Sequence, residues 1–270
     1  MKKRINFARM YAGILTLLIS FILSAVFVLS DPQGPDSILP KGSGFHTNET
    51  GSILIGAQAG NVTALVVSQQ RSTQAWQGYY GNVTGTIVLD DAGNFTLYDW
   101  SLPTPSGEIY AVNSSTVVTW SNVYCMNTSN HRMVNGSPGN NGPGVVYKIN
   151  ASQIELNFGI NTTDLDGLNE TFYDTYTDTT GFTVGAVTID VADGCSMAHP
   201  YTDEVADTNW QELLLTDNTS LIFTSLIRNS PNGFRSGSED LNDFEMVVLE
   251  NGHTQQALVT TPYYFYIELN

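Results

Sequence analysis

Short stretches of alternating apolar and polar residues recur along the chain after residue 60. Side chains of a β-strand point alternately to its two faces, so this period of two predicts strands. Residues rich in Gly, Asn, Asp and Pro separate most of the stretches, as turns do. We predict about ten short strands, at 61–68, 82–89, 95–100, 108–112, 116–120, 153–158, 182–190, 220–227, 244–250 and 263–269. Such a series predicts an all-β, sandwich-like domain, with a barrel as the alternative.

The clearest local signal is a β-hairpin within Gly81–Trp100. Two β-branched and aromatic runs flank the sequence DDAGN, whose Asp, Gly and Asn residues are typical of a turn. Each run is entered through an Asn-x-Thr triplet, at Asn82 and at Asn94. A glycan is bulky and hydrophilic, so two acceptor sites predict that the hairpin lies on an outer surface.

Two further segments have a distinct pattern. The last strand, YYFYIEL, is predicted to be central, with Tyr263, Phe265 and Ile267 on one face and the intervening tyrosines on the other. A short helix is predicted within 203–215, where Trp210 and two leucines would share a face. We expect most of the Trp and Tyr side chains, including that of Trp100, to fill the core and its edges.

The N-terminus has the pattern of a membrane signal. Basic residues within 1–9 precede an uncharged apolar run at 10–30. A helix of that length is about 31 Å long, enough for the hydrocarbon core, and the basic flank favours a cytoplasmic N-terminus. The run is either a retained signal anchor or a signal peptide cleaved after Ser30. A type IV pilin leader is a third interpretation, although Met10 and Tyr11 after Arg9 match its cleavage site poorly.

Composition shifts divide the rest of the chain. Residues 31–58 contain "DPQGPDSILPKGSG", which is rich in Pro and Gly and predicts a stalk. Residues 59–270 form the predicted extracellular β domain. The chain has 10 basic and 26 acidic residues, and four of the basic ones lie within 1–9, so the part beyond residue 30 has 6 − 26 = −20 charges. A surface of this sign repels nucleic acid, which excludes that class of partner.

Asn-x-Ser/Thr triplets are more frequent than composition explains. The chain has 23 Asn and 22 + 29 = 51 Ser and Thr among 270 residues, so chance predicts about four such triplets. Eleven are present, at Asn48, Asn61, Asn82, Asn94, Asn113, Asn127, Asn135, Asn150, Asn161, Asn169 and Asn218. The excess predicts a glycosylated, extracytoplasmic protein. Only one triplet lies in the last hundred residues, which predicts either a contact surface there or deeper burial of that part.

The chain has two cysteines, Cys125 and Cys195. In an extracytoplasmic protein such a pair predicts a disulfide. The bond would join the two halves of the β region, which favours one large domain over two small ones.

Signals for catalysis or metal binding are weak. Asp164, Asp166 and Asn169 cluster oxygen ligands around a glycine, but without the spacing of a calcium-binding loop, so a solvated acidic loop is preferred. Ser196 and His199 lack the Gly-x-Ser-x-Gly motif of a nucleophile elbow. Paired carboxylates for glycoside hydrolysis depend on spatial separation, so that alternative stays open. We predict no catalytic residues, no cofactor and no resident metal.

Six blocks together resemble a known group of proteins. They are WQGYYGNVTG, LYDWSL, GEIYA, VTWSNVYC, DFEMVVLENG and YYFYIEL, in this order between residues 76 and 269. This arrangement resembles an uncharacterised family of secreted or membrane-anchored, β-rich archaeal surface proteins. The resemblance implies an archaeal cell envelope and an extracellular domain behind a signal or anchor helix, and it implies no catalytic residues.

These patterns predict an archaeal cell-surface glycoprotein with a structural or adhesive role and no enzymatic activity. Its partners would be the membrane, through the N-terminal helix, and other surface proteins or copies of itself. The protein would be a single-pass membrane protein, or secreted if it is cleaved after Ser30. Two alternatives are a pilin-like filament subunit and a secreted carbohydrate-binding or carbohydrate-active protein.

Overall fold

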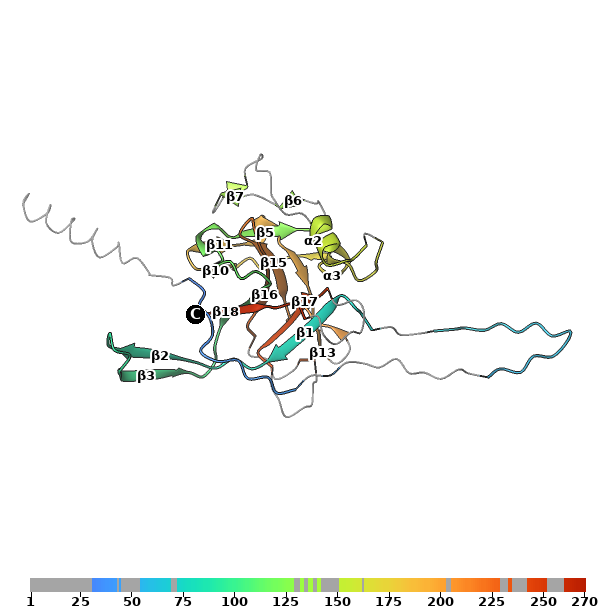
Figure 1. The fold of residues 1–270 in the computed structure, drawn as a ribbon, viewed down its shortest axis with the longest axis horizontal. Helices are drawn as coiled ribbons and strands as arrows, with labels where there is room; N and C mark the ends of the chain where they lie inside the picture. The colour runs from blue at the N-terminus through green and yellow to red at the C-terminus, as the bar shows by residue number, and fades with distance from the viewer. Residues whose placement is uncertain are drawn as a thin grey trace, which may run out of the picture. The chain divides into compact units, whose positions relative to one another are not determined.

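The computed structural model describes the following residues, which are coloured in Figure 1: 31–42, 44, 54–68, 72–128, 132–133, 136–137, 140–141, 151–161, 163–202, 205–228, 233–234, 242–251 and 260–270. Residues 31–270 belong to one compact unit. No helix among the described residues is long and apolar enough to span a bilayer. The predicted span at 10–30 lies outside them.

An antiparallel sheet of eight strands forms the centre of this unit, which confirms the all-β prediction. Its path runs in the order β18 (Tyr264–Leu269), β4 (Gly107–Val112), β16 (Leu221–Leu226), β15 (Glu212–Thr216), β12 (Ser196–Ala198) and β9 (Asp174–Thr175). The edge of β15 is shared, because β12 pairs with its first half and β5 (Tyr124–Asn127) with its second. β6 (Arg132–Met133) pairs with β5.

The middle strands are buried on both faces of the sheet. Every residue of β15 and β16 is buried. On one face lies a first core cluster, which includes Ala111, Leu214 and Phe223. On the other lies a second cluster, which includes Tyr110 and Leu213. Burying apolar side chains on both faces is the main stabilising contribution that such a sheet can make.

Elements from distant parts of the chain cover the first face. β1 (Trp76–Gly81) and β17 (Phe244–Leu249) pair as a second, two-stranded antiparallel sheet. Its inward residues join the first core cluster, where the Trp76 and Phe223 rings meet edge to face at 6.3 Å. The helices α2 (Ala151–Asn157) and α3 (Leu168–Thr171) contribute to the same cluster, and Figure 1 shows β1 and β17 beside each other.

The second face is covered by smaller elements. The hairpin of β10 (Phe182–Val184) and β11 (Val187–Ile189) turns at Gly185, whose φ of 56° favours glycine. The 3₁₀ turns η1 (Trp120–Asn122) and η2 (Val191–Asp193) flank this layer. Trp120 packs between the rings of Tyr110 and Tyr266, at 5.0 and 5.2 Å.

Three more antiparallel pairs complete the described structure. They are β2 (Gly85–Asp90) with β3 (Thr96–Leu102), β7 (Gly136–Ser137) with β8 (Asn140–Asn141), and β13 (Tyr201–Thr202) with β14 (Val205–Ala206). The predicted strands at 108–112, 220–227, 244–250 and 263–269 are confirmed as β4, β16, β17 and β18. The predicted strand at 182–190 is instead the β10–β11 hairpin.

Two predictions assigned the wrong type of element, a strand where a helix forms and a helix where strands form. Residues 153–158, predicted as a strand, lie mostly in helix α2, because Ala151, Ile154 and Phe158 are buried at helical spacing. Residues 203–215, predicted as a helix, contain β14 and most of β15. Leu213 and Leu214 are adjacent yet both buried, since they point into opposite core clusters. Adjacent leucines therefore reflect a doubly covered strand in this segment.

Two other predicted strands are not formed. Residues 116–120 run into η1; Val118 and Trp120 are buried at a period of two, but their backbone joins no ladder. Residues 61–68 are all exposed and form no strand, and no strand among the described residues pairs with them.

The final strand has the predicted faces but a different position. Phe265 and Ile267 pack on the first core cluster and Tyr266 on the second. However, β18 lies at the end of the sheet path, so the prediction of a central strand was wrong. Its outer edge is bridged by Gln33, whose N–H and C=O both bond Ile267, at 3.0 and 2.8 Å. The segment predicted as a stalk therefore begins against the sheet.

Candidate interaction site

The predicted hairpin is confirmed as β2 and β3. Ile87 lies opposite Trp100, and Leu89 lies opposite Tyr98. In the turn, the Asp91 carboxylate accepts the N–H groups of Gly93 and Phe95 at 2.8 and 3.0 Å. Asn94 has a φ of 63°, which an asparagine tolerates in a turn. The local sequence thus accounts for the turn without help from the rest of the chain.

One face of this hairpin is apolar and uncovered. Its residues, which we call the hairpin face, are Ile87, Leu89, Tyr98 and Trp100; their exposed fractions are 55, 49, 58 and 49%. The rings of Tyr98 and Trp100 contact each other at 4.8 Å. The expectation that Trp100 belongs to the core is therefore wrong: it lies on the surface.

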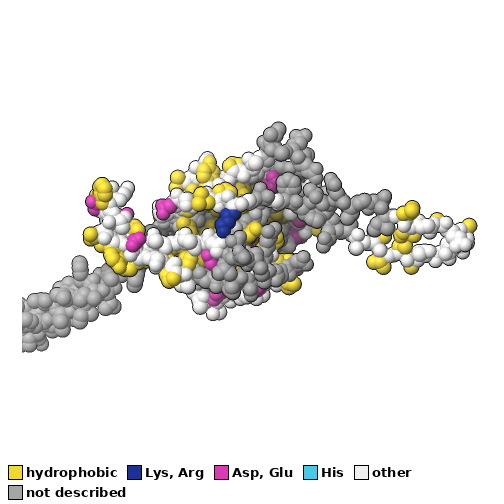
Figure 2. Space-filling view, turned by 90° about the horizontal axis from the view of Figure 1, so that it is seen from below, with side chains coloured by type: hydrophobic (Ala, Val, Ile, Leu, Met, Phe, Trp, Pro, Cys, Tyr) yellow, Lys and Arg dark blue, Asp and Glu magenta, His cyan; other side chains and the backbone are white. Residues whose placement is uncertain are grey.

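Further apolar residues of the hairpin are exposed, among them Val88 and Leu97. Figure 2 shows hydrophobic side chains gathered over this hairpin. At its base, Gly85 approaches Leu269 so closely that a Cβ would lie 2.4 Å from that side chain. A two-stranded hairpin whose faces are both uncovered is only marginally stable in water. An uncovered apolar surface of this kind is typical of contact sites.

The segment 54–68 is a second uncovered apolar stretch. Val62, Val66 and Val67 are 98, 100 and 87% exposed. β-branched residues in an extended segment favour strand pairing. Among the described residues no strand pairs with this segment.

The acceptor asparagines lie where a glycan could be attached. Of the eleven, Asn48, Asn135 and Asn150 lie outside the described residues. None of the other eight is buried: Asn61, Asn82, Asn94, Asn113 and Asn161 are exposed, and Asn127, Asn169 and Asn218 are half-buried. Asn127 is the most constrained, because its Nδ2 donates a hydrogen bond to the Gly194 carbonyl at 3.1 Å.

The scarcity of triplets near the C-terminus has a structural explanation. β15 and β16 are buried throughout, and β17 packs against the first core cluster. The described C-terminal strands therefore form much of the domain core. This burial favours the simpler of the two explanations, in which few exposed positions remain there for glycans.

The disulfide prediction is confirmed: Cys125 of β5 and Cys195, directly before β12, are bonded. Both cysteines are buried in the second core cluster, with at most 2% exposed. The bond closes a loop of 70 residues and links β5 to the residue before β12, and these two strands pair with successive parts of one edge of β15.

The weak calcium candidate has its oxygens engaged by neighbours. Asp164 accepts the backbone N–H of Asn161 at 2.9 Å, and Asp166 accepts the hydroxyl of Thr73 at 2.6 Å. Asn169 lies in α3. Within the described ranges no three His, Cys, Asp or Glu side chains are grouped to hold a metal ion. The calcium candidate stays a prediction.

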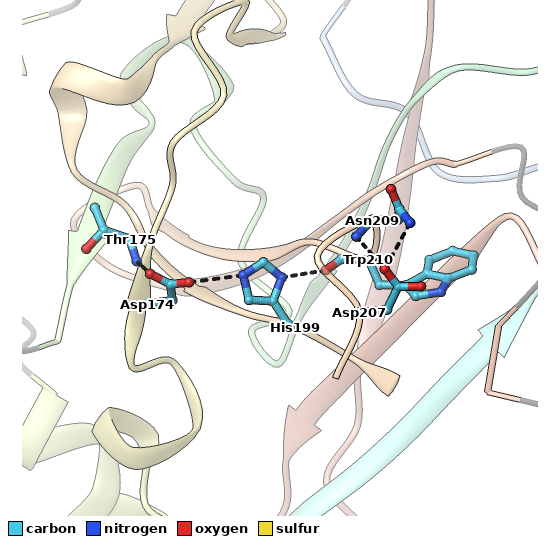
Figure 3. A network of polar contacts seen from close by, with 6 residues as sticks. All are labelled: Asp174, Thr175, His199, Asp207, Asn209 and Trp210. Atoms are coloured by element: carbon cyan, nitrogen blue, oxygen red, sulfur yellow. Dashed lines mark hydrogen bonds and ion pairs between the residues drawn. The ribbon is translucent and has the colours of Figure 1, made fainter. Parts of the chain in front are cut away.

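Ser196 and His199 have separate partners. The Ser196 hydroxyl accepts the backbone N–H of Thr128 at 2.9 Å. The imidazole of His199 bridges the carboxylate of Asp174, at 3.1 Å, and the carbonyl of Trp210, at 3.0 Å, as Figure 3 shows. The His199 side chain is only 8% exposed, so these hydrogen bonds are largely shielded from water. They hold β9 and the segment before β15 against each other.

Sequence reasoning missed a set of buried acids. Glu108, Glu212, Glu245 and Glu268 are each at most 6% exposed. Burial, followed by the charge of Glu268, raises the pKa of Glu108 to about 8. Burial likewise raises the pKa of Glu245 to about 7, although hydrogen bonds oppose it. The acidic composition indicated only a charged surface; the usable signal was a glutamate at an inward position of an apolar strand, as in GEIYAV.

The chain matches no known protein-family model, no curated protein and no solved structure.

Proposed function

We propose that this protein is a glycosylated archaeal cell-surface protein with a structural or adhesive role. Its sandwich-like β domain is carried outside the cell behind the membrane helix at 10–30, and it contacts copies of itself or another surface protein through the hairpin face. The packing of the β1–β17 sheet on one face of the central sheet supports the sandwich-like arrangement. The buried disulfide supports an oxidising compartment.

The observation that carries the contact role is the hairpin face itself. Four large apolar side chains, each about half exposed, lie together on paired strands whose turn is held by local hydrogen bonds. Aromatic residues such as Tyr98 and Trp100 contribute much of the binding energy in protein interfaces. Asn82 precedes this surface and Asn94 lies in its turn, so glycans there would border the contact at both ends.

Chemical cross-linking of the full chain on intact cells tests this proposal. The variant Tyr98→Ser with Trp100→Ser removes the aromatic half of the hairpin face, and we expect it to lose the cross-linked species that the native protein forms. Leu97→Ser is the matched control, because Leu97 is 81% exposed on the same hairpin but outside the hairpin face. Mass spectrometry of the cross-linked species distinguishes a second copy from another protein. An unchanged cross-linking pattern in the double variant would refute the role of this face.

A further inference from the structure

A cavity of about 350 Å³ opens at one end of the second core layer, and none of its lining residues belongs to β2 or β3. It lies where β4 begins, where the chain leaves β16, and beside the segment 176–188. Four ionisable side chains line it, those of Glu108, Tyr176, Asp178 and Arg228. Its size is within the range of ligand pockets, roughly 300–1,000 Å³.

Among the described residues, four buried side-chain atoms have no hydrogen-bond partner, and two of them belong to residues that line the cavity. Glu108 is 3% exposed, and its Oε2 is buried without a hydrogen bond; the same holds for Nε of Arg228. The guanidinium is otherwise held, since its Nη2 donates to Gln211 at 2.5 Å. Buried polar atoms in proteins are almost always satisfied, so two unsatisfied ones around one cavity indicate a missing partner that both donates and accepts.

The charges around the cavity nearly cancel. Hydrogen bonds from the backbone and hydroxyl of Thr180 lower the pKa of Asp178, so its carboxylate is ionised. With a pKa of about 8, Glu108 is mostly protonated at neutral pH and offers an O–H donor. One carboxylate therefore faces one guanidinium, which disfavours a strongly charged ligand of either sign.

The remaining lining combines aromatic and hydroxyl groups. The rings of Tyr176 and Phe182 meet edge to face at 5.8 Å. Burial, followed by the charge of Asp178, raises the pKa of Tyr176 to about 12, so its phenol is neutral. The hydroxyls of Ser106 and Thr180 donate to the Asn270 carbonyl and to Asp178, so they offer acceptor oxygens to the cavity, and Thr188 adds a third hydroxyl group. Aromatic rings beside short, polar side chains suit a ligand that has C–H faces and many hydroxyl groups.

We propose that this cavity binds a neutral sugar of one or two rings, with Glu108 and Arg228 as its principal hydrogen-bond partners. Hydroxyl groups of a sugar supply both the acceptor that Arg228 Nε–H lacks and the partner that Glu108 Oε2 lacks. The site goes beyond the proposed contact function, because none of its residues belongs to β2 or β3.

Saturation-transfer NMR on the full chain tests the site, with glucose, galactose, mannose and N-acetylglucosamine as probes. We expect saturable binding of at least one probe, with a Kd in the range of ~1 mM. Glu108→Met, which keeps the volume but removes both oxygens, should weaken that binding at least ~10-fold, equivalent to ~1.4 kcal/mol. Glu108→Gln retains a donor and an acceptor and should keep most of the binding.

Stability is measured in parallel. Replacing a buried acid by an apolar residue of similar size is often neutral or stabilising, so Glu108→Met should remain folded. Glu212→Gln is the matched control, because Glu212 is a fully buried glutamate of the same sheet that does not line the cavity. This variant should bind the sugars as the native protein does. Absence of saturable binding for all four sugars would overturn the proposal. So would preferential binding of glucuronate, glucosamine or Ca²⁺, or native sugar binding by a folded Glu108→Met.

Discussion

Glu268 of β18 lies directly across from Glu108 of β4, so two buried carboxyl groups share one face of a pair of strands. Glu268 is hydrogen-bonded by the backbone N–H of Gly185 at 2.9 Å and by the Tyr110 hydroxyl at 3.3 Å. Burial raises the pKa of Glu268 as well as that of Glu108. Like charges opposite each other are destabilising, so at least one of the two carboxyls keeps its proton at neutral pH.

This pair predicts that stability falls as pH rises. Above pH ~4.3 an unfolded glutamate has released its proton, whereas folded Glu108 holds it up to about pH 8. The folded state therefore binds more protons, and the free energy of unfolding decreases from about pH 4 to about pH 8. Thermal unfolding should show a melting temperature several degrees lower at pH 8 than at pH 5. Glu108→Gln should reduce this difference, and Glu170→Gln, at an exposed position, should preserve it. An equal slope in Glu108→Gln and the native protein would contradict the assignment.

The disulfide should make a large contribution to stability. A loop of 70 residues corresponds to about 4 kcal/mol in the chain-entropy model. Replacing Cys125 and Cys195 together by Ala should lower the melting temperature by ~10 °C, given ~2–4 °C per kcal/mol for a domain of this size. Calorimetry of the double variant, with the reduced native protein for comparison, measures the effect. A change below ~2 °C would mean that the bond does not constrain the unfolded chain.

Gly107 should not tolerate a side chain. Its φ is +127°, and a Cβ there would lie 2.0 Å from the Glu268 carbonyl oxygen. Gly107→Ala should therefore destabilise the protein by more than ~2 kcal/mol. Gly78→Ala is the control, because nothing lies within 4 Å of its added Cβ, and it should be neutral or slightly stabilising. Chemical denaturation of both variants gives the comparison, and equal midpoints would show that β18 is not placed against Gly107 as described.

Glycan occupancy should follow side-chain exposure. Asn82 and Asn94 are exposed and should be occupied. Asn127 is half-buried, and its Nδ2 bonds the Gly194 carbonyl, so a glycan there would break that bond and open the edge beside Cys195. Glycopeptide mass spectrometry of the native protein should find Asn127 empty. Full occupancy of Asn127 with Asn94 empty would contradict this placement of β5 and of the hairpin.

Several features could be read directly from the residues. The β2–β3 hairpin follows from DDAGN between two β-branched and aromatic runs, because its turn is closed by local bonds. The strands at 108–112 and 220–227 follow from short stretches rich in apolar, β-branched and aromatic residues. The disulfide followed from the number of cysteines and the predicted compartment. In each case the signal lies within a few residues or in composition, so it does not depend on which segments meet.

Long-range pairing decided the rest. Adjacent Leu213 and Leu214 resemble part of a helix until both faces of β15 are covered, and apolar spacing within 151–158 suits a strand until the turn of α2 forms. Nothing local places Glu268 opposite Glu108, which is 160 positions earlier, or brings Arg228 to the same cavity. Sequence thus determined where the chain extends and turns and which side chains can be buried. Only the tertiary structure decided which carboxyl groups are buried away from water and which apolar face stays uncovered, because both depend on the neighbours that other segments supply.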